Sequence, residues 1–218
     1  DSLQKRGADG DYQQKELNEV MDVKPSLERL CLTIKEYVPG KKGIVYAISI
    51  QHAEHIAEFY RENGIKAVAI SSKTPLAERQ ELIERFKFSS LSPSLNSASD
   101  DIEVLVSVDL FSEGFDCPDV EFIQLARPTL SLAKYMQMVG RGLRVAEGKE
   151  YCVILDNVGL YKRFGLPSVD RDWQSMFEGR TSMEDILQEA CMHVNSHNCR
   201  MDVLMDGDKE MMKIINHE

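Results

Sequence analysis

The chain has 218 residues, of which 43% are hydrophobic, and these proportions allow one substantial hydrophobic core. It contains no run of about 18 apolar residues, so we expect no membrane-spanning segment and no membrane partner. The formal net charge of −10 counts against binding of nucleic acid through a broad basic face, but it leaves open a narrow binding strip or a cleft completed by another domain.

The N-terminal part, residues 1–40, is predicted to be a linker followed by a helical lead-in. Residues 1–15 are polar and contain two glycines, a composition typical of linkers. From residue 15 to residue 37 apolar side chains recur at helical spacing, and Pro25 interrupts the pattern. We therefore expect two helices here, the second ending at the Pro-Gly pair at 39–40.

Residues 41–157 are predicted to form an α/β domain, because short apolar strands alternate with amphipathic helices. The predicted strands are residues 43–48, 66–70, 103–108, 120–126 and 150–155, the predicted helices are 51–63, 75–88 and 131–139, and a Ser-rich surface loop is predicted at 89–101. Near-continuous apolar strands favour a parallel sheet with helices on both faces. Since such sheets bind ligands at the carboxyl ends of their strands, we expect functional loops after Val108, after Ala126 and around Gly140.

The C-terminal part, residues 158–218, is predicted to be an irregular segment followed by a helical extension that starts near Thr181. Basic and aromatic residues alternate between 161 and 180, which fits either a nucleic-acid strip or a loop pinned to the core by its aromatic rings. The methionine-rich tail, residues 201–218, fits a short packed helix or a disordered end.

Two arginines three residues apart, Arg141 and Arg144, stand in a segment with two glycines, 140 and 142. At a helix start this spacing puts both guanidinium groups on one face, where they can bind phosphate in a bidentate way. The glycines would allow close backbone approach. Taken alone, the segment fits an exposed basic turn equally well.

A second polar segment follows the strand at 103–108 and contains Asp109, Gly114 and Asp116, with Pro118 stiffening the turn. Asp116 is suited to accept a ribose hydroxyl or to hold a water. Asp109 stands at the ligand-binding edge of the predicted sheet, although a helix-capping role fits it equally well.

In order and spacing, residues 40–157 resemble the C-terminal RecA-like lobe of superfamily 2 helicases of the DEAD/DEAH type. The matching segments are residues 43–59, 70–87, 104–118 and 135–144, which resemble helicase motifs IV, IVa, V and VI. Two positions depart from the family pattern: Met138 stands where arginine is frequent, and Ser72 stands where glycine is frequent. The departure at Met138 puts one polar link to the ATP site in doubt.

The resemblance implies that the chain is the second motor lobe of an ATP-dependent helicase that acts on DNA or RNA. Arg141 and Arg144 would be arginine fingers that reach the γ-phosphate of ATP. Other residues would bind ATP, namely Gly114, Asp116 and Gln137, and a third group would contact the nucleic-acid backbone with little sequence preference, namely Ser49, Ser72, Ser107 and Asp109.

Neither a G-x-x-x-x-G-K-[ST] phosphate loop nor a D-E-x-[DH] motif occurs in the sequence. In this family both belong to a first lobe, which holds the ATP phosphates and Mg²⁺. The resemblance thus implies a fragment of a longer protein that is inactive alone and holds no metal itself. We expect a monomer whose partner is the first lobe of the same protein. The alternatives are a double-strand translocase, a non-catalytic RecA-like binding module, and a small-molecule-binding doubly wound domain. The absence of a Gly-rich turn after the first strand counts against the last of these.

The five cysteines are odd in number and the chain opens without an apolar signal region, which favours reduced thiols and a cytoplasmic location. Four potential metal ligands lie within nine residues, namely Cys191, His193, His197 and Cys199. Their spacing is tighter than in usual zinc sites, so a helix end with polar surface histidines is favoured over a zinc site. Two further histidines, His52 and His55, are predicted to lie on the solvated side of their helix.

Overall fold

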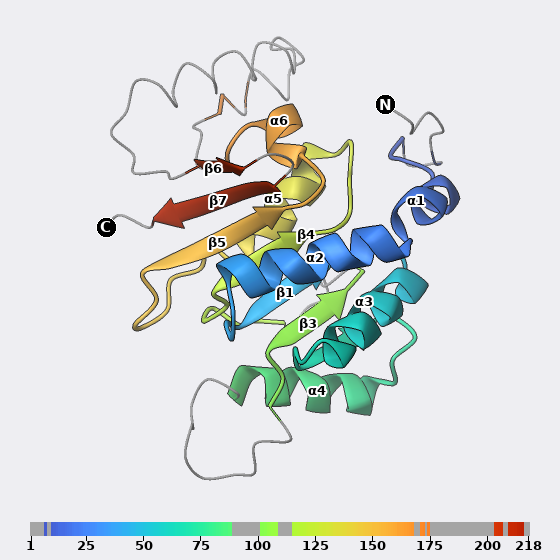
Figure 1. Cartoon of the computed structure of the whole chain (residues 1–218). Coiled ribbons are helices and arrows are strands. Elements are labelled where there is room, and N and C mark those ends of the chain that lie inside the picture. Colours follow the sequence, from blue (N-terminus) through green and yellow to red (C-terminus); the bar gives the residue numbers. More distant parts are fainter. Residues whose placement is uncertain are drawn as a thin grey trace.

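The computed structural model of the chain describes residues 7, 10–88, 101–108, 115–167, 171–172 and 174, and the backbone of 203–206 and 209–215 (Figure 1). The helices are α1 Gln14–Met21, α2 Lys24–Tyr37, α3 Ile50–Glu62, α4 Leu76–Phe88, α5 Leu132–Gly140 and α6 Leu160–Phe164. The strands are β1 Gly43–Tyr46, β2 Ala67–Ile70, β3 Val104–Ser107, β4 Phe122–Leu125, β5 Tyr151–Asp156, β6 Val203–Asp206 and β7 Lys209–Ile215.

The strands form one sheet in the order β2-β3-β1-β4-β5-β7-β6. The first five strands are all parallel, with Gly43 of β1 in register with Val104 of β3 on one side and Phe122 of β4 on the other. The prediction of a parallel sheet is confirmed for these five strands, and all their carboxyl ends therefore lie at one edge.

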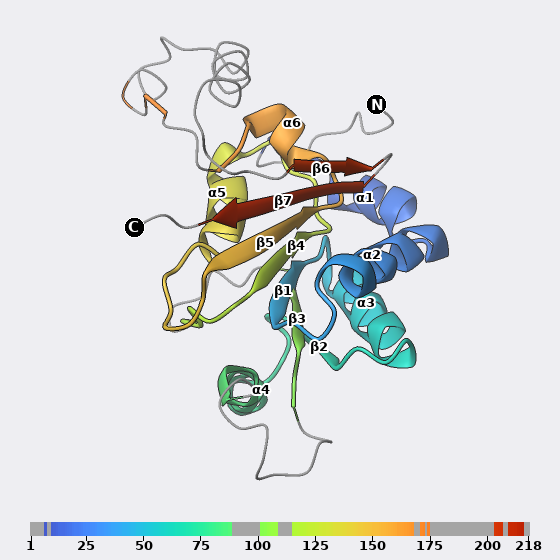
Figure 2. The same cartoon turned by 60° about the vertical axis from the view of Figure 1, so that its left-hand side comes forward.

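Helices cover both faces of the sheet, as predicted (Figures 1 and 2). Each face buries its own apolar cluster. On one face the side chains of α4, α5 and α6 pack against alternate strand residues such as Ile44 and Tyr46. On the other face α2 and α3 pack against Val45, Val106 and their neighbours. The strands are apolar on both sides because both sides are covered.

The lead-in helix α2 belongs to the core of the domain. The predicted interruption falls just before Pro25, which lies in the first turn of α2, where its missing N–H costs no hydrogen bond. A buried amide then ties three elements together: Tyr60 Oη of α3 donates to Gln124 Oε1 of β4 over 2.6 Å, and Gln124 Nε2 donates to the carbonyl of Leu30 in α2 over 3.0 Å. The packed body thus includes residues that precede position 41.

The tail differs from its prediction as a short helix or a disordered end. Residues 203–206 and 209–215 form an antiparallel pair of strands, and β7 extends the sheet by pairing with β5. Without β7, β5 would be an edge strand with unpaired backbone groups, and pairing with such an edge overrides a weak local pattern. The predicted helix starting near Thr181 lies outside the described residues, as does most of the Ser-rich loop.

None of the described helices is both long and apolar enough to cross a lipid bilayer. The three described cysteines, Cys31, Cys117 and Cys152, are buried free thiols.

Candidate functional site

The serines predicted to contact nucleic acid lie at the carboxyl edge of the sheet, but they differ in exposure. Ser49 follows β1, is buried, and caps α3 by accepting a hydrogen bond from the backbone N–H of His52 over 3.1 Å. Ser107 is the last residue of β3 and is also buried. Ser72 lies in the turn after β2 and is exposed. Among the three, only Ser72 presents an exposed side chain at this edge, while Asp109 lies outside the described residues.

The two arginines lie just after α5, and the local sequence explains how that helix starts and packs. Ser131 begins the helix by accepting a hydrogen bond from the N–H of Lys134 over 3.3 Å. Tyr135, Met138 and Val139 are buried at the i, i+3, i+4 spacing that anchors an amphipathic helix on a sheet. The last helical residue is Gly140, and residues 141–143 form a turn in which the N–H of Gly142 donates to the Val139 carbonyl over 2.9 Å.

Each arginine contacts the segment that follows the strand β3 in the chain. Arg141 Nη1 donates to the carbonyl oxygen of Phe115 over 2.7 Å. Arg144 Nη1 pairs with Asp116 Oδ1, and both side chains are largely exposed, by 42% and 69%. Phe115 itself is buried and stacks on Phe86 of α4 with ring centroids 6.4 Å apart. The residues that resemble motifs V and VI are thus neighbours in space, and the buried ring of Phe115 anchors their contact in the core.

The arginine turn lies away from the carboxyl edge, contrary to the expectation for the loop around Gly140. Helix α5 starts beyond the carboxyl end of β4 and runs back along the sheet. Its nine residues rise by about 13 Å, which is about the length of the four residues of β4. Gly142 consequently lies against Ile123 and Cys152, the second residues of β4 and β5.

The two glycines of this turn differ in their surroundings. An added β-carbon at Gly142 would lie 2.7 Å from Cγ1 of Ile123 and closer still to Sγ of Cys152. At Gly140 nothing lies within 4 Å of that position. The predicted close approach is therefore found at Gly142 only, and there it is packing against the core.

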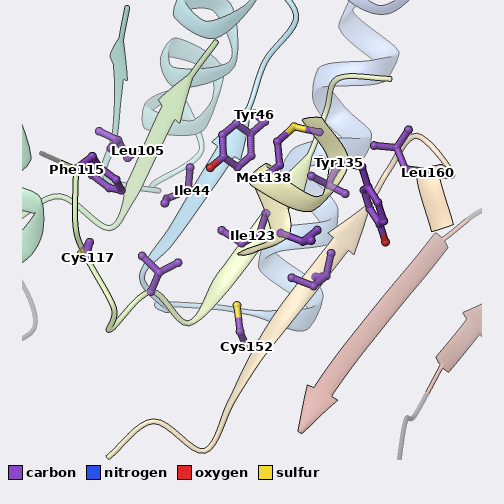
Figure 3. Close-up of a cluster of buried hydrophobic side chains, with 14 of the residues drawn as sticks. Ile44, Tyr46, Leu105, Phe115, Cys117, Ile123, Tyr135, Met138, Cys152 and Leu160 are labelled. Atoms are coloured by element: carbon purple, nitrogen blue, oxygen red, sulfur yellow. The ribbon is translucent and has the colours of Figure 1, made fainter. Parts of the chain in front are cut away.

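The remaining predicted ATP-site residues are placed differently from one another. Gln137 is exposed on α5, and Gly114 lies outside the described residues. Met138, which stands where the family pattern has arginine, is only 2% exposed and belongs to the same buried cluster as Tyr46 (Figure 3). Met138 therefore packs in the core and supplies no polar contact to the ATP site.

Sequence reasoning missed a lysine that contacts both segments of the site. Lys149 Nζ donates to the carbonyl oxygens of Gly142 over 2.7 Å, Pro118 over 2.8 Å and Arg144 over 3.0 Å. Its partners are backbone carbonyls, which every residue possesses, so no side-chain pattern could reveal the contacts. The single available signal was its place between Gly148 and a predicted strand.

One of the two histidine predictions is wrong. His52 is fully buried and its Nδ1 accepts a hydrogen bond from the N–H of Ile48 over 3.3 Å, so burial lowers its pKa to about 4. His55 is 42% exposed and lies 3.0 Å from a carboxylate oxygen of Asp22.

The basic and aromatic segment after β5 is pinned to the core where it is described. Phe164 is buried, and the buried Arg171 donates to the carbonyl oxygens of Phe164 over 2.9 Å and Leu166 over 2.8 Å. Of the two interpretations left open, these contacts favour the pinned loop.

No group of three or more His, Cys, Asp and Glu side chains suited to a metal ion occurs within the described part of the chain. The candidate zinc ligands from Cys191 to Cys199 fall outside it.

Comparison with known proteins identifies the family. Residues 25–146 match the family model described as "Helicase conserved C-terminal domain". The "51.5 kDa protein" of Lactococcus phage (isolate 7-9) is 39% identical over 149 residues, and "Putative ATP-dependent helicase IRC3" of Saccharomyces cerevisiae is 30% identical over 152 residues. The matches cover 67% and 68% of this chain but only 30% and 20% of those relatives.

Among solved structures, the fragment of "a putative HsdR subunit of a type I restriction enzyme" from Vibrio vulnificus YJ016 superposes with a TM-score of 0.53. The two chains are 20% identical, and the match covers 72% of this chain and 32% of that one. This likeness shows a shared fold. With the family model matching more than half of its residues, the chain belongs to the family described as the helicase conserved C-terminal domain.

Proposed function

We propose that this chain is the second motor lobe of an ATP-dependent helicase, and that Arg141 and Arg144 are the arginine fingers it contributes to ATP hydrolysis. ATP would bind between this lobe and a first lobe of the same protein, which would hold the phosphates and Mg²⁺. The exposed residues at the carboxyl edge of the sheet, Ser72 among them, would contact the backbone of DNA or RNA.

One observation carries the proposal: both arginines of the turn after α5 contact the segment 115–116 that follows β3. Arg141 donates to the Phe115 carbonyl, and Arg144 pairs with Asp116. These contacts link the predicted ATP-sensing arginines to the segment that follows β3 in the chain. A displacement of the segment 115–116 would therefore displace the arginine side chains, and the reverse.

The ion pair of Arg144 with Asp116 is compatible with a role on phosphate. An exposed pair of this kind contributes at most about 1 kcal/mol. A γ-phosphate carries more negative charge than one carboxylate and accepts bidentate hydrogen bonds from a guanidinium group. We expect Arg144 to exchange Asp116 for phosphate when the two lobes close on ATP.

The catalytic groups that would bind the phosphates and Mg²⁺ have no counterpart in the sequence motifs of this chain. We therefore propose that the isolated lobe hydrolyses no ATP. The test is ATP hydrolysis by the full-length protein, with and without single-stranded and double-stranded DNA and RNA, for wild type, Arg141→Ala and Arg144→Ala.

The polymer that stimulates turnover would identify the substrate, and stimulation by duplex without strand separation would identify a double-strand translocase. If no polymer stimulates turnover, the non-catalytic binding module takes the place of the motor. Turnover by the isolated lobe would contradict its proposed dependence on a partner.

A further inference from the structure

Lys149 stands out because its ammonium group contacts both loops of the proposed ATP-sensing site. It follows Gly148, whose φ of +76° closes a tight turn before β5. The three hydrogen bonds go to the carbonyl oxygens of Pro118, Gly142 and Arg144, at 2.8, 2.7 and 3.0 Å. An ammonium group has three N–H donors, so its whole donor capacity is used on these carbonyls.

The three acceptors belong to two chain segments that no β-ladder joins. Pro118 closes the segment that begins with Phe115 and Asp116, the partners of the arginines. Gly142 and Arg144 form the turn that carries the arginines, which lies in neither helix nor strand beyond Gly140. The ammonium group of Lys149 therefore holds the backbones of these two segments together, as hydrogen bonds between strands would in a sheet.

The neighbouring lysines have different partners and provide the comparison. Lys41 pairs with the Glu121 carboxylate over 3.0 Å, and Lys42 pairs with Asp119 over 2.8 Å. Together with Lys149 they line a hollow of about 620 Å³ at the amino-terminal edge of the sheet. Lys41 makes a surface ion pair, whereas the partners of Lys149 are carbonyl oxygens of the site itself.

The environment of Lys149 is consistent with a structural cation. The residue is half-buried, and burial lowers its pKa while the nearby Cys152 and Asp119 act in the opposite direction. A half-buried ammonium group is retained only where acceptors replace its water shell, and the three carbonyls do so here.

We infer that Lys149 is a positioning residue for ATP hydrolysis, whose ammonium holds the arginine turn against the 115–118 segment so that Arg141 and Arg144 reach the nucleotide together. This inference rests on the proposed function. Lys149 would touch neither ATP nor nucleic acid, so it would act on the rate of hydrolysis through the placement of the arginines. A displacement of about 1 Å in a catalytic group is enough to lower turnover a hundredfold.

The experiment compares Lys149→Met with Lys41→Met in the full-length protein. Methionine keeps the apolar stem of lysine and removes the three donors. We expect Lys149→Met to lower kcat by roughly ten- to a hundredfold with the KM for ATP and the affinity for nucleic acid little changed. Lys41→Met should leave kcat unchanged. Amide hydrogen exchange should increase in residues 140–146 for Lys149→Met but not for Lys41→Met.

A double-substitution cycle separates positioning from a general loss of stability. If Lys149 acts through the arginines, Lys149→Met should lower kcat much less in the Arg144→Ala background than in wild type. Should Lys149→Met fail to fold, Lys149→Arg replaces it, because a planar guanidinium keeps the charge but does not direct three donors to these carbonyls. The same loss of kcat is then expected.

Three results would overturn the inference: an unchanged kcat in the Lys149 variants, an equal loss in Lys41→Met, or full additivity with Arg144→Ala. If instead Arg141→Ala and Arg144→Ala leave hydrolysis unchanged, the proposed function fails. In that case faster amide exchange in residues 140–146 of the Lys149→Met variant would still show that Lys149 holds the turn. Unchanged exchange would refute that role of Lys149 as well.

Discussion

At the scale of single residues, Gly142 has no room for a side chain. Its missing β-carbon would collide with Ile123 and Cys152, which are buried residues of two adjacent strands and cannot move aside independently. Glycine is therefore required here by close packing of the arginine turn on the sheet. Its φ lies outside the left-handed region, so backbone freedom is not the reason.

We predict that Gly142→Ala destabilises the domain by about 1–3 kcal/mol, the usual effect of an extra methyl group in a packed core. Unfolding in urea, followed by circular dichroism, measures it. Gly140→Ala is the matched control two residues away, where the added methyl meets nothing within 4 Å. Equal stability of the Gly142→Ala and Gly140→Ala variants would show that the turn is not packed as described.

At the residue level, the sequence points to side chains with a recognisable chemistry, but it does not show interactions that are made through backbone atoms. The spacing of Arg141 and Arg144, together with the order of the neighbouring motifs, made them candidates for phosphate binding, and their role stays a prediction. Their carbonyl partner at Phe115 and the carbonyl partners of Lys149 left no trace in the side-chain pattern. Burial of His52 was missed since a lone histidine on an amphipathic helix fits either side of it.

At the scale of elements, Ser49, which was predicted to bind nucleic acid, caps the N-terminus of α3. The Ser49 hydroxyl accepts a hydrogen bond from the N–H of His52, one of the donors that a helix start leaves without an intrahelical partner. The side chain is buried, so in this conformation the hydroxyl serves the helix.

We predict that Ser49→Ala lowers the free energy of unfolding by about 1 kcal/mol, as for other N-cap substitutions. Ser72→Ala, at an exposed turn position of the same edge, should leave stability unchanged. The nucleic-acid affinity of the full-length protein should change in the opposite order, with Ser72→Ala weakening binding more than Ser49→Ala. A stable Ser49→Ala variant with impaired binding would restore the original assignment of Ser49.

The parallel strands were predictable because both faces of each are buried, which leaves near-continuous apolar runs such as residues 43–48 and 103–108. The two antiparallel strands β6 and β7 were not predictable in the same way. Residues 209–215 have no clear alternation of apolar and polar side chains, and what makes them a strand is the edge of β5. That edge exists only once the rest of the sheet has formed.

At the scale of the whole molecule, Asp11 ties the N-terminal lead-in to the start of α5 and the loop before it. This buried carboxylate accepts hydrogen bonds from Thr129 Oγ1 over 2.7 Å, from the Leu130 N–H over 2.8 Å and from Lys134 Nζ over 3.0 Å. Burial alone would raise the pKa of Asp11, but these donors and the Tyr12 N–H outweigh it and lower the pKa to about 2. The lead-in is thereby fixed beside the start of α5.

We predict that Asp11→Asn lowers the stability of the domain by about 1–2 kcal/mol at pH 7. The folded-state pKa lies below the ordinary value near 4, so the contribution of the carboxylate is complete above pH 4 and is lost as the pH falls towards 2. The difference in unfolding free energy between wild type and Asp11→Asn should therefore shrink to about half at pH 3. A difference independent of pH would contradict the role of the charge.

The molecule as a whole separates two kinds of surface. The carboxyl edge carries the exposed turn at Ser72, and the arginine turn lies back along the sheet, beside the second residues of β4 and β5. The segment 115–118, which follows β3 in the chain, contacts the arginine turn through Arg141 and Arg144. This arrangement suits a lobe that senses nucleotide in one place and grips a strand in another.

Arg141 and Arg144 are proposed to couple this lobe to ATP hydrolysis, and the most direct test is the kcat of the full-length protein with its stimulating nucleic acid. We predict that Arg141→Ala and Arg144→Ala each lower kcat by roughly a hundredfold or more, the scale expected for arginine fingers, while the folded structure and nucleic-acid binding persist. Stimulated turnover that is unchanged in both variants would show that the chain shares the helicase fold without contributing arginines to the reaction.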